Sequence, residues 1–383
     1  MLNTAGPIGI DLCDDAVRLL QLSSAQGSLR VISSARIDLG RLGLTHDPND
    51  PAPDELVRAV AARVQAGGFK GKRCVITLPD LSLEMRTARL PVMSDSELAS
   101  AVALDAPAHL GLQDEEDGAQ IGWLRTGEVF QGEERRIELV YFGTGTRRLE
   151  QLVDAFGSAG LETVALEPRF VSLTRAATRF LRRAADAETV QIATDICEQH
   201  SEVLITKGAG LVFAKTIPVG AKELNDAIEQ RLGLDAKTVR ELRRQRMDRR
   251  EAHAVEDRVE QAMFDAVRPI LTQIAHETSL CLRHYSVTFR GSRPSRALLV
   301  GANAHEPGLD RVMSETLGIT AQQADPLEGV ATDLVVGGGP YCPAWTAAIG
   351  VATRDLLKAP SSRKRNQRRS TIPQAGQDQE RAA

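Results

Sequence analysis

The sequence contains no apolar run that approaches the roughly 20 residues needed to cross a bilayer, and its N-terminus lacks the basic and apolar regions of a signal peptide. Cysteines are few: the five in this chain are odd in number and scattered, which argues against a disulfide framework. Neither a Walker loop nor a Gly-x-Ser-x-Gly elbow is present. We therefore expect reduced thiols and a cytoplasmic location.

Aromatic residues make up only 4% of the chain, whereas hydrophobic residues make up 42% and charged residues 26%. These proportions and a length of 383 residues favour an α/β protein of two or more domains. The net charge of −4 is uneven, because the tail over residues 361–383 carries +4 and the rest of the chain −8. This tail is too polar to form a core, and we expect it to be disordered, either solvated or drawn to anionic lipid.

The most informative pattern is a strand-ending acid that occurs twice. Residues 8–14 and 191–198 each run from apolar residues to an Asp, then to a branched aliphatic residue, a Cys and a second acid. A new apolar stretch follows each of them, which predicts two β-hairpins whose tight turns carry Asp11 and Asp195. Either segment alone is typical of any α/β protein, but the pair indicates a duplicated chain around a central cleft. A polyphosphate and its metal ion would sit between the two turns.

Hydrophobic periodicity predicts that strands and helices alternate along the chain. Besides the two hairpins, strands are expected at 30–37, 73–79, 84–91, 120–125, 134–142, 211–219 and 296–301. Helices are expected at 54–64, from 94, and at 147–160, 166–183, 224–232, 259–282, 307–318 and 345–356. The helix from residue 94 has the clearest start, because Ser94 and Glu97 have the spacing of a capping box.

The order of these segments resembles the actin-like ATPase superfamily, and within it the PilM proteins of type IV pilus assembly, which are relatives of the division protein FtsA and of the type II secretion L protein. The resemblance spans about residues 7–357, and the segments that carry it are 8–22, 74–105, 158–175, 191–228 and 296–326. It implies an actin-like, ribonuclease H-like α/β fold with two lobes, duplicated mixed sheets and a small inserted α+β subdomain.

The same resemblance implies how the chain is divided. The first lobe would comprise residues 7–73 and 166–187, and the inserted FtsA/PilM-type subdomain residues 74–165. The second lobe would comprise residues 188–357, with about 221–290 as its helical subdomain. The disordered basic tail would occupy residues 358–383.

The resemblance also implies a site for ATP and Mg²⁺ in the cleft between the lobes. Asp11 and Asp195 correspond to the acids of the two phosphate hairpins, Gly220 to the turn into the helix beside the nucleotide, and Gly301 to the adenosine-side glycine turn. The complete set implied for nucleotide and Mg²⁺ is Asp11, Cys13, Asp14, Asp195, Cys197, Gly220 and Gly301. We assign no catalytic residue and no further metal site.

Both turns depart from the family pattern. That pattern resembles Ile-Gly-Ser-Ser-Ser after the first Asp and Ile-Gly-Ala-x-Thr after the second, where this chain has Leu-Cys-Asp-Asp and Ile-Cys-Glu-Gln. Each Cys adds a Cβ where close backbone approach is needed, and Asp14, Asp15 and Glu198 add negative charge where a triphosphate would dock. Two like charges about 4 Å apart repel by about 4 kcal/mol at an effective dielectric of 20. We therefore expect binding of ATP and Mg²⁺ to be weak or lost, while a nucleotide-controlled ATP-binding protein and a weak ATPase stay open as alternatives.

For PilM-like proteins the resemblance implies a partner, which is the short cytoplasmic N-terminus of the membrane protein PilN, held in a groove beside the inserted subdomain. The chain would then be a scaffold at the inner membrane that contacts pilus or secretion motor components and binds no nucleic acid. Whether it self-associates is left open by the resemblance. Candidate groove residues are Met85, Arg86, Arg89 and Leu90, although Met85 and Leu90 equally fit the core of the subdomain. An FtsA-like filament protein recruited to the membrane is the third alternative.

Overall fold

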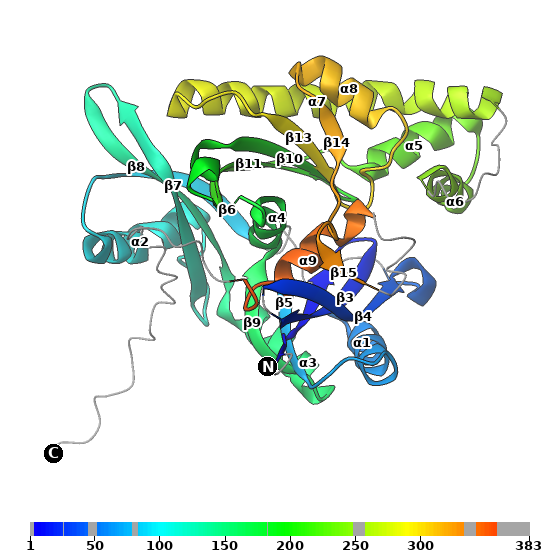
Figure 1. Cartoon of the computed structure of the whole chain (residues 1–383), viewed down its shortest axis with the longest axis horizontal. Coiled ribbons are helices and arrows are strands. Elements are labelled where there is room, and N and C mark those ends of the chain that lie inside the picture. Colours follow the sequence, from blue (N-terminus) through cyan, green and yellow to red (C-terminus); the bar gives the residue numbers. More distant parts are fainter. Residues whose placement is uncertain are drawn as a thin grey trace. The chain divides into compact units, whose positions relative to one another are not determined.

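The computed structural model describes residues 4–25, 27–44, 52–78, 83–181, 183–247, 257–332 and 342–357, and the predicted basic tail over 358–383 lies outside them. The described chain divides into a small unit over residues 83–151 and a large unit that contains the residues before and after it (Figure 1). The domain boundaries inferred from the sequence stay a prediction. Among the helices within the described ranges, none is both long and apolar enough to cross a membrane.

The large unit contains two sheets, and the first is built mainly from N-terminal strands. In chain order these are β1 (Thr4–Ala5), β2 (Ile8–Leu12), β3 (Ala16–Ala25), β4 (Ser28–Asp38), β5 (Arg73–Leu78), β9 (Glu162–Pro168) and β15 (Val330–Ala331). Their order in the sheet is β15-β4-β3-β2-β5-β9, and β1 pairs with β3. The strands β2, β3 and β4 are antiparallel neighbours, whereas β5 and β9 run parallel to β2 on its other side.

The second sheet repeats this plan with later strands. It contains β10 (Val190–Ile196), β11 (Ser201–Lys207), β12 (Gly210–Ile217), β13 (Arg296–Val300) and β14 (Ala321–Gln323). The order is β12-β11-β10-β13-β14, with antiparallel pairing from β10 to β12 and parallel pairing from β10 to β14. The strands β10 to β14 therefore correspond one by one to β2, β3, β4, β5 and β9.

The register of the two hairpins is also the same. Asp11 pairs with Arg18 across β2 and β3, and Asp195 pairs with Glu202 across β10 and β11. In both hairpins this pair lies one position before the last pair of the ladder. The predicted duplication is thus found in both topology and register, and it places the two acids at equivalent positions.

One predicted helix was wrong in its first part. Residues 166–183 were expected to be helical, but β9 extends to Pro168 and pairs in parallel with β5, and the helix α4 begins only at Arg169 and ends at Thr178. The apolar run before Pro168 fits either a strand or a helix, and pairing with β5 decides for the strand. Proline is well placed at the start of a helix because its fixed φ suits this position and its missing N–H is not needed there. Arg169 consequently lies at the strand-to-helix junction.

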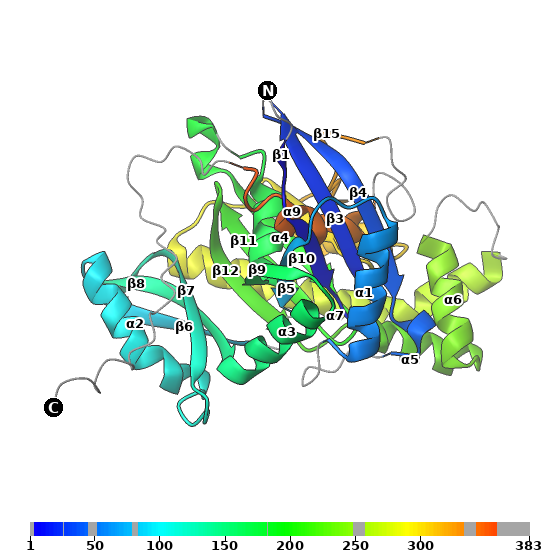
Figure 2. The same cartoon turned by 90° about the horizontal axis from the view of Figure 1, so that it is seen from below.

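Helices pack on both sheets of the large unit (Figures 1 and 2). Helix α9 (Thr346–Ala352), shorter than predicted and preceded by a 3₁₀ turn over Pro343–Trp345, contacts β2, β3 and α4. The long helix α7 (Asp257–Phe289) contacts β11 and β12, and its buried side chains join a large hydrophobic core. The remaining helices described in this unit are α1 (Asp54–Ala66), α5 (Ala221–Leu232), α6 (Ala236–Met247) and α8 (Leu309–Leu317), with short 3₁₀ turns at Gly40–Leu42 and Ala184–Glu188.

The small unit is a three-stranded sheet with one helix packed on it. Its strands β6 (Glu84–Pro91), β7 (Ala119–Gln131) and β8 (Glu134–Gly145) are antiparallel in the order β6-β8-β7. Helix α2 (Asp95–Leu110) begins with the predicted capping box, in which the Ser94 hydroxyl accepts from the Glu97 backbone N–H and the Glu97 carboxylate accepts from the Ser94 N–H. Helix α3 (Thr146–Ser158) leads from this unit back into the large one.

Candidate functional site

The two duplicated acids lie at one site, where both accept hydrogen bonds from the guanidinium of Arg169. The Arg169 Nε donates to Asp11 Oδ1 over 3.2 Å, and Arg169 Nη1 donates to Asp195 Oδ2 over 2.5 Å. All three residues are at most 2% exposed. Burial lowers the pKa of Arg169, but the negative charges of Asp195 and Asp11 outweigh this effect and raise it well above its ordinary value, so the side chain is a cation.

Further contacts hold each acid in place. The Thr77 hydroxyl at the end of β5 donates to Asp11 Oδ1 over 3.0 Å, while the other oxygen, Oδ2, has no hydrogen-bond partner among the described residues. Gly301 lies directly against Asp195: it has a φ of +82°, and a Cβ at this position would be 1.7 Å from Asp195 Oδ1. Because no side chain fits between them, Gly301 is required for the observed position of the carboxylate.

The thiols of the two turns meet beside Arg169. Cys13 and Cys197 are buried and hydrogen-bonded to each other, and this bond together with burial raises the pKa of Cys13 well above its usual range. The bond from Cys13 lowers the pKa of Cys197, but burial outweighs it and raises that pKa to about 12. Arg169 Nη1 also lies 3.7 Å from the Cys197 sulfur. Two neutral thiols therefore fill the space where the family pattern has glycines.

The extra acids of the turns have different environments. Burial raises the pKa of Asp15, but the charge of Arg18 outweighs burial and lowers it, because Arg18 Nη2 lies 2.6 Å from Asp15 Oδ2. Asp15 is thereby neutralised by a neighbour. Glu198 is different: burial raises its pKa, and the negative charges of Asp15 and Asp14 raise it further, while Arg243 lowers it. Asp15 is thus balanced by its neighbour, whereas Glu198 lies close to other acids.

The start of α5 is occupied by the second turn. The backbone N–H groups of Ala221 and Lys222 donate to the carbonyl oxygens of Cys197 and Glu198, each over 2.8 Å. Gly220 makes this contact possible, because a Cβ there would lie 2.6 Å from the Glu198 carbonyl oxygen. Amide groups at a helix N-terminus form a binding place for phosphate when they are free. In this protein the N–H groups of Ala221 and Lys222 are already hydrogen-bonded to the second turn.

A second buried guanidinium lies beside the loop that follows β13. Arg243 of α6 is 3% exposed; it donates to Asn225 Oδ1 over 2.8 Å, to Asn303 Oδ1 over 3.1 Å and to Glu306 Oε2 over 2.8 Å. Arg246 also donates to Glu306, over 3.1 Å. The loop carries Asn303 and Glu306 just after Gly301, so buried polar side chains are bonded to the loop that the resemblance assigns to adenosine.

Neither Arg169 nor Arg243 was predicted from the sequence as a site residue. Arg169 stood within a predicted helix, and Arg243 within a stretch so rich in charge that no residue of it was distinctive. A signal did exist for Arg169, since an arginine directly after a strand-ending proline is placed at an edge where other strand ends also lie. Its two partners, however, are distant in sequence and could not be identified from local pattern.

The arrangement does not fit a magnesium-bound nucleotide as it stands. Mg²⁺ requires near-octahedral oxygen ligands and usually binds one or two carboxylates together with phosphates and water. Here both carboxylates already pair with a guanidinium, both turns carry a thiol in place of a glycine, and the amides at the start of α5 are bonded to the second turn. Of the oxygens on these two carboxylates, Asp11 Oδ2 is the one that lacks a hydrogen-bond partner in the described part of the chain.

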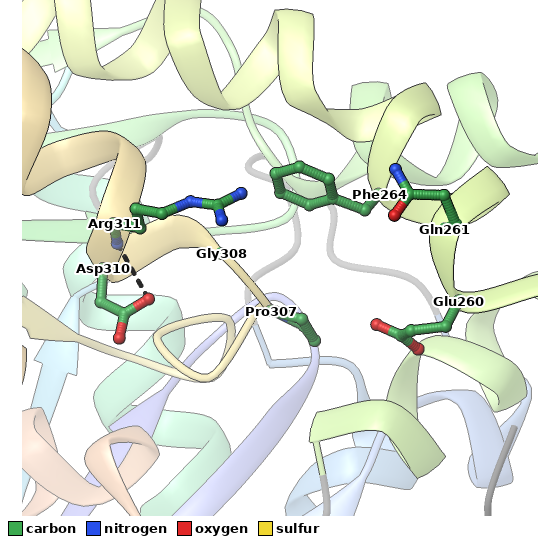
Figure 3. Close-up of a pocket in the computed structure, with 7 residues that line it drawn as sticks. All are labelled: Glu260, Gln261, Phe264, Pro307, Gly308, Asp310 and Arg311. Atoms are coloured by element: carbon green, nitrogen blue, oxygen red, sulfur yellow. Dashed lines mark hydrogen bonds between the residues drawn. The ribbon is translucent and has the colours of Figure 1, made fainter. Parts of the chain in front are cut away.

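A pocket of about 550 Å³ lies elsewhere in the large unit, between the beginnings of α7 and α8 (Figure 3). It is lined by Glu260, Gln261, Phe264, Pro307, Gly308, Asp310 and Arg311. The Arg311 guanidinium lies 5.2 Å from the centre of the Phe264 ring, so part of this charge is engaged in a cation–π contact. The lining includes none of the predicted nucleotide residues.

The predicted partner residues all lie on β6, at one edge of the small sheet. Arg86 is exposed and forms an ion pair with Glu84 over 3.4 Å. Arg89 donates to the buried carboxylate of Glu138 over 2.7 Å, so it balances a charge inside the unit. Leu90 is half-buried against the core of the unit, which agrees with the alternative interpretation for this residue, and Met85 is half-buried as well.

Comparisons with known proteins extend over nearly the whole chain. The family model described as "Type IV pilus assembly protein PilM" matches residues 9–354. The structure of a PilM–PilN type IV pilus biogenesis complex is similar with a TM-score of 0.72 and 17% sequence identity, and the match covers 93% of this chain and 99% of that one. The ethanolamine utilization protein EutJ from Carboxydothermus hydrogenoformans has a TM-score of 0.52 and 13% identity, with 92% and 90% of the two chains covered. No curated protein gives a significant sequence match. The predicted actin-like fold is confirmed.

Proposed function

The chain belongs to the family of type IV pilus assembly proteins PilM, and from this premise we propose that it is a scaffold at the cytoplasmic face of the inner membrane in a type IV pilus or type II secretion-like assembly. It would bind the cytoplasmic N-terminus of a PilN-like single-span membrane protein and connect it to motor components. The observation that carries this proposal is the family match over residues 9–354, and the likeness in fold to a PilM–PilN complex supports it. Attachment to the membrane would come through the partner.

The free edge of β6 supports a place for such a peptide. Because the small sheet has the order β6-β8-β7, β6 pairs on one side only with another strand in the described part of the chain. Extended peptides bind to such edges by backbone hydrogen bonds, and neighbouring side chains give specificity. Arg86, with 57% of its side chain exposed, is available to contact the peptide, whereas Arg89 is tied to Glu138.

We further propose that the scaffold works without a tightly bound nucleotide. The pairing of Arg169 with Asp11 and Asp195, and the charge of Asp14 and Glu198 near the turns, support this view. A phosphate group entering here would meet acids whose counter-charge is already used, and a metal ion would have to displace the guanidinium. A nucleotide-controlled scaffold, the alternative interpretation, would require Arg169 to leave both acids.

Capture of the partner tests the scaffold. The full chain is purified and titrated with a fluorescent peptide that copies the cytoplasmic leader of a single-span protein encoded beside it. We expect saturable binding that is weakened at least tenfold by Arg86→Glu. The matched control is Arg135→Glu, which makes the same charge change on β8, where the side chain is 56% exposed. Equal affinities for both variants and the parent protein would place the peptide elsewhere, and absence of any capture would contradict the scaffold proposal.

Titration of the parent protein with labelled ATP and Mg²⁺ tests the nucleotide proposal separately. We expect no saturable binding in the micromolar range. A low-micromolar dissociation constant would overturn the proposed loss of nucleotide binding and leave the scaffold role untouched.

A further inference from the structure

We propose that Arg169 is an internal replacement for the divalent cation of the cleft, so that the guanidinium joins the ends of β2 and β10 permanently, and that Arg243 fills the nucleoside side in the same way. This inference deepens the proposed loss of nucleotide binding by assigning to named residues the positions that metal and nucleoside would take. The positions of metal and nucleoside would then be occupied by side chains of the protein itself.

The hydrogen bonds at the site support this assignment. Asp11 and Asp195 are buried on strands of two different sheets, which share no strand pairing in the described residues. Two buried carboxylates facing one region repel each other and need a counter-charge. A guanidinium supplies five N–H donors in one plane, so a single side chain reaches both acids, as Arg169 does through Nε and Nη1. A divalent cation would satisfy the same two groups.

The guanidinium is held in place by the junction from which it projects. Arg169 follows Pro168, the last residue of β9, which pairs with Leu78 of β5. The Glu167 carboxylate accepts a hydrogen bond from Ser172 and two from Arg175, over 2.7 and 3.0 Å. The start of α4 is thus cross-linked to the end of β9. A fixed origin restricts the freedom of the Arg169 side chain and favours its position between the acids.

The nucleoside side is filled through a second network that meets the first. Asn303, which accepts from Arg243, also donates to the carbonyl oxygen of Ile196, the residue that follows Asp195. Arg243 in turn donates to Asn225 on α5 and to Glu306 in the same loop as Asn303. Polar groups that could meet a ribose or a base are therefore bonded to one another, and each is buried.

Removal of the arginine distinguishes a cation replacement from an ordinary buried ion pair. Arg169→Ala leaves two buried carboxylates facing a space, one of which has Oδ2 without a hydrogen-bond partner among the described residues. Such a site is expected to take a divalent ion, because oxygen ligands of hard cations then converge without a counter-charge. Loss of Arg175, which pairs with the single carboxylate of Glu167, lowers stability but leaves no pair of facing carboxylates.

The experiment compares the thermal unfolding of three full-length proteins with MgCl₂ or MnCl₂ as the probe. We expect Arg169→Ala to lower Tm, and millimolar Mg²⁺ or Mn²⁺ to raise the Tm of this variant by roughly 2–4 °C, with no rise in the parent protein. The matched control is Arg175→Ala on the same helix, whose partner Glu167 is also buried. We expect the control to lose stability without rescue by either metal.

A triple variant keeps the test decisive if the single variant Arg169→Ala does not fold in the absence of metal. In Arg169→Ala combined with Asp11→Asn and Asp195→Asn, the buried charges are gone, so we expect folding to return and the metal effect to disappear. Refolding of Arg169→Ala only when Mg²⁺ or Mn²⁺ is present also supports the proposal. Metal rescue no greater than in Arg175→Ala, or a variant that stays unfolded with metal while the triple variant folds, would overturn it. The outcome does not depend on ATP titration of the parent protein.

Discussion

Gly301 offers the sharpest test of the geometry around Asp195. A Cβ at this position would lie 1.7 Å from Asp195 Oδ1, and the φ of +82° is unfavourable for a side chain. The left-handed backbone costs an alanine about 1–2 kcal/mol. Displacing the carboxylate from Arg169 adds the cost of a broken buried pair, about 3–5 kcal/mol. We therefore expect Gly301→Ala to lower the free energy of unfolding by about 4–7 kcal/mol, a large part of the roughly 5–15 kcal/mol typical of a native protein.

The control is Gly233→Ala, at the end of α5. Gly233 also has a left-handed φ, +66°, but its added Cβ meets no atom within 4 Å. This variant should bear the backbone cost alone, about 1–2 kcal/mol. Urea and thermal unfolding of both variants, followed by circular dichroism, measure the difference. If Gly301→Ala is no less stable than Gly233→Ala, the close contact between Gly301 and Asp195 does not exist in solution and the reasoning fails.

Three further predictions concern the two turns and nucleotide binding. Burial raises the pKa of Glu198 in the folded protein, so its negative charge lowers stability at neutral pH. This cost disappears below about pH 4, where the carboxyl group of the unfolded chain is protonated as well. Glu198→Gln should therefore raise Tm at pH 7, and the increase should vanish on acidification. Cys13 and Cys197, whose thiol pKa values are raised, should resist iodoacetamide at about pH 8 in the folded protein, while denaturation exposes them; mass spectrometry of the labelled peptides is the measurement. Millimolar ATP with Mg²⁺ should leave the affinity for the leader peptide unchanged within twofold.

The fold could be predicted from the sequence where local pattern and duplication agreed. The two Asp hairpins were predicted because an apolar run, an acid and a second apolar run recur in the same order, and the ladders place Asp11 and Asp195 at matching positions. The capping box at Ser94 was predicted for a similar reason, since its two partners are three residues apart. Each of these signals is contained within a few residues of the chain.

The predictions that failed depended on contacts that the local sequence pattern does not reveal. Residues 166–168, the end of β9, were taken for the start of a helix because apolar residues suit both structures, and only pairing with β5 distinguishes them. Arg169 was missed because its partners, Asp11 and Asp195, lie 158 and 26 positions away in the chain. Asp15 was expected to add charge to the cleft, whereas Arg18 pairs with it, a contact three residues away that the hairpin register brings about.

An internal guanidinium and a bound nucleotide differ in how their occupancy of the site depends on solute concentrations in the cell. A nucleotide occupies its site in proportion to its concentration, and the stability it adds rises with the logarithm of that concentration. A side chain fixed at the β9–α4 junction is always present at its site, so the tie between β2 and β10 is independent of any solute. Such a permanent contact suits a scaffold that must present one surface to its partner at all times. It also prevents nucleotide from switching the protein between open and closed forms. Under the proposed loss of nucleotide binding, the two turns are expected to depart from the family pattern and to carry thiols and acids in place of glycines and hydroxyls, because no phosphate would have to be accommodated.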